Sequence, residues 1–185
     1  VGWAASCVIW RAAEVNELIG PLSPRSWDAL TVITVGTGSP YENPERLGPS
    51  TGIGWKDQVL LVDVGRGVAE GLRVSKIPVS QPSRVLLTSL MPESTLGLDD
   101  LLLTGWLAGR DQPLRVVGPP GTRALVAGIQ AAHAGAGTRA AALELPEAGG
   151  RLEPEEITGD IVRTRDGLTI RALSLTDGAS ASLAW

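Results

Sequence analysis

The stretch Val85–Leu98 constrains this chain more than any other part of its sequence. Arg84–Leu87 predicts a buried strand, because its last three residues are apolar and favour a strand covered on both faces. A polar loop follows, in which Pro92 and Ser94 are typical of the start of a helix. Leucine then recurs through Leu98–Leu107, which predicts a packed helix. A buried strand, a polar loop and a helix therefore follow one another directly.

Three further landmarks surround this stretch in a definite order. A strand over Leu30–Val35 runs into the glycine-rich turn Gly36–Pro40, where glycine permits positive φ angles. Gly48–Thr51 leads into a hairpin whose second strand, Val59–Gly65, is apolar and closes with Asp-Val-Gly. Val116–Thr122 reads as a strand that turns through Gly-Pro-Pro-Gly into a helix.

In this order the landmarks resemble the metallo-β-lactamase superfamily, most closely its ribonuclease Z-like and arylsulfatase-like branch. In that family the buried strand ends in Thr-His-x-His-x-Asp-His-x-x-Gly. On this pattern Ser89, Met91 and Ser94 stand where three histidines belong, and Glu93 stands in the place of the aspartate. The resemblance covers residues 30–185. It implies an α/β fold, the αββα sandwich, here expected to be truncated in its second half.

The resemblance also implies that metal ligands have been lost from the whole chain. A paired-metal hydrolase site of this family uses about five histidines and two aspartates, whereas this chain has a single histidine, His133, at the predicted end of a helix. Asp177 stands where a further family histidine belongs, and an Asp-Gly pair is ordinarily a turn. We therefore expect degenerate ligand positions, no metal, no cofactor and no catalytic residue.

Composition limits the class of protein further. The chain has 185 residues, of which 43% are hydrophobic and 19% are charged, which is typical of one globular domain. A net charge of −4 argues against a nucleic-acid partner, because phosphate binding needs clustered Lys and Arg. One cysteine excludes an intrachain disulfide.

The N-terminal segment predicts an amphipathic or anchor helix over residues 1–20, followed by a linker over residues 21–29. Its apolar run is about half the length that a bilayer-spanning helix requires. Trp3 and Trp10 with Arg11 favour docking to a membrane interface or a partner protein. The alternatives are a helix that covers its own domain and the remnant of a secretion signal.

The leading hypothesis is therefore a catalytically inactive subunit of a larger, membrane-bound complex, with other protein subunits as partners. A respiratory or photosynthetic complex is a natural host, and the periplasmic face is favoured for a bacterial protein. One alternative is a metal-independent enzyme that uses Ser89, Ser94, Glu93 and Asp63. Another is a module that binds a small ligand or lipid in the vacated cleft around Leu90 and Met91.

The remaining sequence predicts a helix over residues 67–75 and a surface excursion over residues 134–160, which are rich in Ala, Gly, Glu and Pro. Ile161–Thr164 and Leu168–Leu175 predict a hairpin, because Asp166-Gly167 suits a tight reversal.

Overall fold

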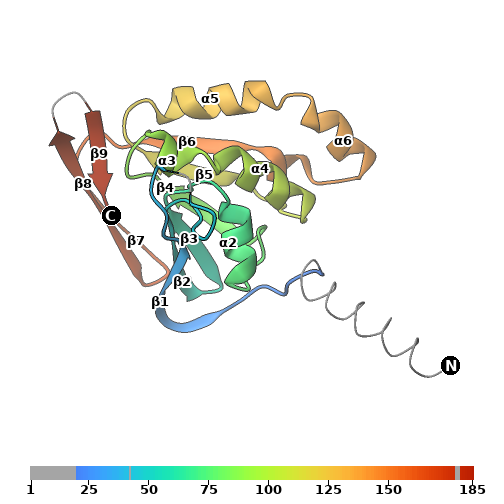
Figure 1. Cartoon of the computed structure of the whole chain (residues 1–185), viewed down its shortest axis with the longest axis horizontal. Coiled ribbons are helices and arrows are strands. Elements are labelled where there is room, and N and C mark those ends of the chain that lie inside the picture. Colours follow the sequence, from blue (N-terminus) through green and yellow to red (C-terminus); the bar gives the residue numbers. More distant parts are fainter. Residues whose placement is uncertain (1–19, 42, 178–179) are drawn as a thin grey trace.

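The computed structural model describes residues 20–41, 43–177 and 180–185. In this part of the chain a layer of helices covers one face of a large sheet, and a small sheet lies against its other face (Figure 1). The large sheet consists, in spatial order, of β1 (Trp27–Gly36), β2 (Ser50–Lys56), β3 (Gln58–Val62), β4 (Pro82–Leu86), β5 (Leu114–Gly118) and β6 (Leu152–Glu156). The small sheet consists of β7 (Ile161–Arg165), β8 (Leu168–Asp177) and β9 (Ser180–Ala184). The helices are α2 (Val68–Val74), α3 (Pro92–Thr95), α4 (Leu98–Leu107), α5 (Thr122–Ala132), α6 (Ala136–Ala142) and the 3-10 helix η1 (Glu147–Gly150).

The large sheet is mixed. Strands β1, β2 and β3 pair antiparallel, and β3 to β6 pair parallel. The parallel strands β3, β4 and β5 are covered on both faces, which explains why each contains adjacent apolar residues: Val59–Val62, Val85–Leu86 and Val116–Val117. Leu61 and Val85 face the helices, whereas their chain neighbours Leu60 and Leu86 face the small sheet. Each fully buried side chain of this size stabilises the fold by about 1.5–3 kcal/mol.

The predicted hairpin is confirmed by β7 and β8, which pair antiparallel from Ile161↔Ala172 to Arg165↔Leu168. Asp166 and Gly167 have φ angles of 52° and 84°, as a two-residue hairpin turn of the primed type requires. The turn is held against the large sheet, because the indole Nε1 of Trp55 donates to the carbonyl of Asp166 at 3.0 Å.

The expected surface excursion over residues 134–160 is wrong in one respect. It contains β6, which pairs parallel with β5 and buries Leu152. The sequence of β6, Leu-Glu-Pro-Glu-Glu, is polar and contains a proline, so it carries no strand signal of its own. As an edge strand it tolerates both features, and pairing with β5 imposes the extended conformation. Among the described residues, no helix combines the length and the apolar character needed to cross a membrane.

Two loops cross each other in direct backbone contact beside the sheet. The amide of Gly65 donates to the carbonyl of Pro49 at 3.0 Å, and the amide of Gly48 donates to the carbonyl of Arg66 at 2.9 Å. A Cβ atom added at Gly65 would lie 2.5 Å from the carbonyl carbon of Gly48. Glycine at this position therefore allows the close approach of two backbones, which anchors the segment after β3.

We expect Gly65→Ala to lower the free energy of unfolding by about 3 kcal/mol, because rigid backbone atoms must move to admit the methyl group. The matched control is Gly128→Ala in α5, where nothing lies within 4 Å of the added Cβ. The control should leave stability unchanged or raise it by up to about 1 kcal/mol through helix propensity. Urea titration of both variants would measure the difference, and equal midpoints would contradict the packing argument.

Candidate functional site

The candidate site lies where the carboxyl ends of the parallel strands β3, β4 and β5 meet. Asp63 follows β3, Thr88 follows β4, and Gly121 lies in the turn between β5 and α5. The amide of Asp63 donates to the carbonyl of Leu86 at 3.0 Å, and this bond continues the strand pairing up to the loops. Ligand sites of open α/β sheets lie at this edge, because the loops that follow parallel strands gather there.

Asp63 joins the end of β3 to the end of β4. Its Oδ1 accepts a hydrogen bond from the amide of Thr88 and its Oδ2 accepts one from the hydroxyl of Thr88, both at 2.8 Å. Its own backbone has a φ angle of 57°, and its carbonyl accepts the hydroxyl of Ser50 at 2.9 Å. Both carboxylate oxygens are thus used in holding the two strand ends together.

Burial raises the pKa of Asp63 above its ordinary value. Hydrogen bonds from Thr88 and from the side chain of Ser94 work in the opposite direction, and the charge of Glu93 adds to the rise. The position is therefore an unfavourable one for a negative charge.

The loop after β4 carries the four residues that the pattern places at ligand positions. The hydroxyls of Ser89 and Ser94 lie 3.2 Å apart, and the amide of Met91 donates to the Ser89 hydroxyl at 3.2 Å. Ser94 is buried, Glu93 is half-buried, and the side chain of Met91 is 47% exposed. The loop thus brings Ser89, Met91, Glu93 and Ser94 together within one turn, and the Met91 side chain lies at the surface.

Backbone hydrogen bonds fix this loop on both sides. The amide of Val64 donates to the carbonyl of Ser94 at 2.9 Å, and the amide of Gly97 donates to the carbonyl of Val64 at 2.8 Å. From the small sheet, the amide of Leu183 in β9 donates to the carbonyl of Thr88 at 2.7 Å. Both sheets therefore determine the conformation of the loop.

The remaining predicted residues lie elsewhere. Asp177 is the last residue of β8 and pairs through its backbone with Ser180. The expected docking residues Trp3, Trp10 and Arg11 fall outside the described part of the chain.

The donor set of the loop does not fit the paired metal ions of the family pattern. Divalent transition metals prefer imidazole, thiolate and carboxylate ligands, whereas Ser89 and Ser94 offer neutral hydroxyls and Met91 a thioether. Within the described residues, no group of three or more His, Cys, Asp or Glu side chains could hold a metal ion. The carboxylates near the loop are Asp63, which is bonded to Thr88, and Glu93. We therefore derive no chemical step through a metal.

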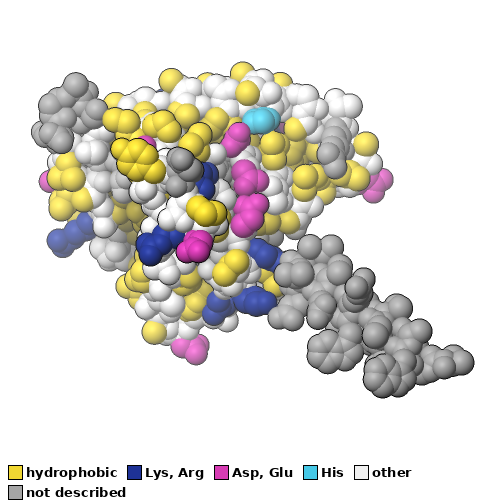
Figure 2. Space-filling model, viewed as in Figure 1, with side chains coloured by type: hydrophobic (Ala, Val, Ile, Leu, Met, Phe, Trp, Pro, Cys, Tyr) yellow, Lys and Arg dark blue, Asp and Glu magenta, His cyan; other side chains and the backbone are white. Residues whose placement is uncertain are grey.

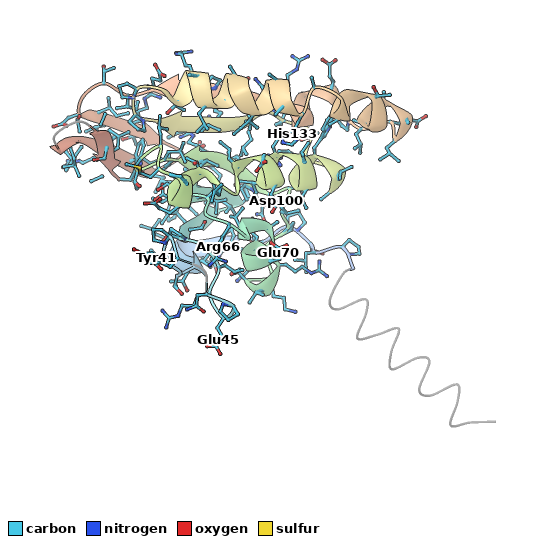
Figure 3. The ribbon with its side chains drawn as sticks, turned by 45° about the horizontal axis from the view of Figure 1, so that its top comes forward. Tyr41, Glu45, Arg66, Glu70, Asp100 and His133 are labelled. Carbon is cyan, nitrogen blue, oxygen red and sulfur yellow. The ribbon has the colours of Figure 1, made fainter. Side chains whose placement is uncertain are left out.

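His133 contributes to a contact between helices. It caps the C-terminus of α5, and its Nε2 lies 3.4 Å from Oδ2 of Asp99 in the first turn of α4. Figure 3 shows His133 between α4 and α5, away from Tyr41.

One rim of the site is formed by the segment before β2. The guanidinium of Arg66 donates to the backbone carbonyls of Tyr41 and Arg46, both at 3.3 Å, and the Tyr41 side chain is 78% exposed (Figure 3). A hollow of about 60 Å³ lies here, lined by Ser39, Pro40, Gly48, Pro49, Arg66, Pro92, Glu93 and Leu96. This volume is below the 300–1,000 Å³ that is usual for small-ligand pockets.

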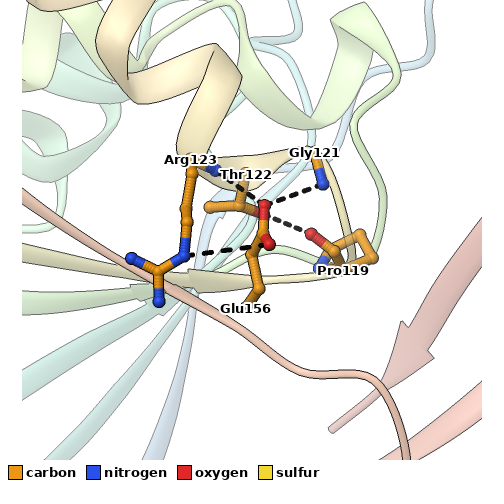
Figure 4. Close-up of polar contacts among 5 residues, drawn as sticks. All are labelled: Pro119, Gly121, Thr122, Arg123 and Glu156. Carbon is orange, nitrogen blue, oxygen red and sulfur yellow. Dashed lines mark hydrogen bonds and ion pairs between the residues drawn. The ribbon is translucent and has the colours of Figure 1, made fainter.

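Glu156 was missed by sequence reasoning. At the end of β6 its Oε1 accepts hydrogen bonds from the amides of Gly121 at 2.9 Å and Arg123 at 3.0 Å, and Oε2 lies 3.8 Å from Nε of Arg123 (Figure 4). The carboxylate thus caps the N-terminus of α5, where negative charge is favoured. These hydrogen bonds, led by the one from Arg123, lower the pKa of Glu156.

The capped turn packs directly against the loop after β4. A Cβ atom added at Gly121 would lie 2.7 Å from Cδ1 of Leu90. The sequence signal for this cap was the turn Gly118–Gly121, which offers no side-chain acceptor to the helix that follows. The first amides of that helix therefore need an acceptor from another segment.

Comparison with known proteins shows what this chain is similar to. No family model matches it. It is 38% identical over 146 residues to a protein of Mycobacterium marinum named Ribonuclease Z, and 37% identical over 146 residues to a Ribonuclease Z of Mycobacterium bovis. Each match covers 77% of this chain and 52% of the relative, so the chain spans about half the length of these relatives.

Among solved structures, human tRNase Z, short form, superposes with a TM-score of 0.63 at 19% identity, over 81% of this chain and 61% of that one. A metallo-β-lactamase fold protein from Bacillus subtilis superposes with a TM-score of 0.56 at 16% identity, over 83% of this chain and 61% of that one.

The fold, together with the sequence similarity to proteins named Ribonuclease Z, is that of the metallo-β-lactamase superfamily. Within it, the chain is ribonuclease Z-like in sequence over 146 residues. The predicted α/β fold and the family resemblance are thus confirmed.

Several functional expectations are wrong. The relatives bear the name of an enzyme, which contradicts a catalytically inactive structural subunit of a respiratory or photosynthetic complex. It equally contradicts the exclusion of nucleic acid and the membrane-associated localisation. Net charge did not exclude nucleic acid, because it averages over the whole surface whereas binding depends on local charges. The four loop residues did not exclude an enzyme, because they bear on metal binding and not on the substrate.

We expect Asp63→Ala to lower the free energy of unfolding by about 1–3 kcal/mol, because the amide and hydroxyl of Thr88 lose their acceptors. Asp63→Asn should cost clearly less, since the amide oxygen can still accept from the Thr88 amide. Chemical denaturation of both variants at neutral pH would compare them. Equal losses would show that the charge of Asp63, and not its hydrogen bonds, stabilises the strand ends.

A second prediction concerns acid stability. Because the pKa of Glu156 is lower in the folded protein than its ordinary value of 4.5, its charged form stabilises the fold above that pH. This contribution is lost as the pH falls through the folded-state pKa. Glu156→Gln should therefore be less stable than the original protein at pH 7, with the difference closing below about pH 4. Thermal unfolding across this range would test it, and a difference independent of pH would contradict a role for the charge.

Proposed function

We propose that the protein acts on RNA as a ribonuclease Z-like hydrolase, with transfer RNA as its substrate class. The observation that carries the proposal is the 38% identity over 146 residues to a protein named Ribonuclease Z. The substrate class is supported by the solved relative titled human tRNase Z, short form. The matched region includes most of the described fold, so it extends well beyond one short motif.

The location of the candidate site supports the same proposal. The loop after β4 lies at the carboxyl edge of the parallel strands, open to solvent through Met91 and Glu93. At its rim, Tyr41 exposes its ring and Arg66 provides a positive charge. Exposed aromatic rings stack on unpaired bases, and guanidinium groups pair with phosphates, so this rim offers both contacts that single-stranded RNA uses.

Charge determines how such an RNA would bind. Figure 2 shows basic and acidic side chains interspersed on one face of the molecule, without a continuous basic area. With a net charge of −4, the chain repels a polyanion at long range. We therefore expect binding to depend on a few local contacts near Arg66 and to weaken steeply as salt is added.

Glu93 is the carboxylate of the loop that remains available for proton transfer. Asp63 is bonded to Thr88 through both oxygens, whereas Glu93 is half-buried at the start of α3 beside the rim residue Arg66. We assign to Glu93 the acceptance of a proton from a water molecule as the water oxygen bonds to phosphorus. The bond from phosphorus to the leaving ribose oxygen breaks, and that oxygen takes up a proton from solvent.

The test is incubation of the purified protein with a 3′-extended transfer RNA and, in parallel, with DNA of the same sequence. We expect cleavage of the RNA at a defined position, no cleavage of the DNA, and loss of activity at high salt. Glu93→Gln should reduce the rate by about 100-fold or more, the usual effect of removing a general base.

The matched control is Glu70→Gln, which removes an exposed carboxylate from α2 and should leave the rate unchanged. RNA that is neither bound nor cleaved at low salt would overturn the proposed substrate class. Cleavage that is equally fast in Glu93→Gln would leave the substrate class standing and remove the role given to Glu93.

A further inference from the structure

We infer that the loop after β4 is a metal-free site. Its ligand positions Ser89 and Ser94 bond to each other, and Asp63 bonds to Thr88 beside them. The inference rests on the donor set and its contacts. It does not depend on the proposed function.

The two serine hydroxyls of the loop bond within the protein. Ser89 and Ser94 lie 3.2 Å apart, and Ser89 also accepts the amide of Met91. Ser94 is 4% exposed, so its hydroxyl meets protein atoms instead of solvent. A serine hydroxyl binds a divalent transition metal weakly, and here the two hydroxyls already serve each other.

Both carboxylate oxygens of Asp63 are already engaged within the protein. Each accepts a hydrogen bond from Thr88 at 2.8 Å. The side chain of Met91, which carries the thioether, is 47% exposed.

The protein backbone supports the loop from both sides. Backbone hydrogen bonds from Val64, Gly97 and Leu183 fix it between the two sheets. A loop that is held by the protein itself keeps its conformation when metal is withdrawn. A loop organised by ions loses stability under the same treatment.

The experiment measures metal content and stability, not activity. The purified protein is treated with EDTA, dialysed against zinc or manganese, and examined by elemental analysis and thermal unfolding. We expect well below one ion per chain after removal of free metal, and the same melting temperature with EDTA as with zinc. His133→Ala serves as the control for zinc bound at the α4–α5 contact, away from the loop.

A gain-of-binding variant tests the assigned cause. The combination of Ser89→His, Met91→His, Glu93→Asp and Ser94→His restores the family pattern, and we expect it to bind zinc and to melt at a higher temperature in its presence. Zinc bound by this variant and not by the original protein would support the inference, and zinc bound equally by both would overturn it. If this variant does not fold, the metal content of the original protein and of His133→Ala decides the matter.

Stoichiometric zinc in the original protein that persists in His133→Ala would overturn the metal-free site. Absence of zinc in both proteins, with unchanged stability towards EDTA, would support it. The metal content and the cleavage of RNA are measured independently, so the metal-free site and the proposed function can fail separately. Cleavage of RNA by a zinc-free protein supports both statements, whereas a zinc-free protein that neither binds nor cleaves RNA removes only the proposed function.

Discussion

The pair of hydrogen bonds between the carboxylate of Asp63 and Thr88 is the interaction on which the arrangement of the site depends. Parallel strands pair through their backbones only as far as their last residues, and the loops that follow need other bonds. Here one side chain after β3 takes both the amide and the hydroxyl after β4. The loop of Ser89, Met91, Glu93 and Ser94 then begins from a fixed point.

The rest of the site builds outward from that point. The crossing of Gly48 and Gly65 fixes the chain after β3, and Glu156 fixes the turn before α5 through Gly121 and Arg123. These contacts come from segments that are far apart in the sequence. They hold the loop in place through hydrogen bonds and packing within the protein itself. Fold alone does not transfer chemistry, which must be argued from the side chains present.

The fold could be predicted in large part from the sequence. The apolar runs of β3, β4 and β5 identify buried parallel strands, and Asp166-Gly167 identifies a hairpin, because both signals arise from local chemistry. The strand β6 could not be predicted, since its polar residues become a strand only by pairing with β5. For the same reason the capping role of Glu156 was not visible. Its partners lie 35 and 33 residues earlier in the chain.

By itself, the sequence determined which residue types stand in the loop after β4, and thereby that hydroxyls and a thioether replace imidazoles there. It also determined the family, through the order of its strands and glycine turns. Only the tertiary structure decided that Asp63 is bonded to Thr88, that Ser89 meets Ser94, and that the Met91 side chain faces solvent. The physical reason is that donor chemistry belongs to single residues, whereas burial and hydrogen-bond partners are set by strands and loops that meet only in the folded chain.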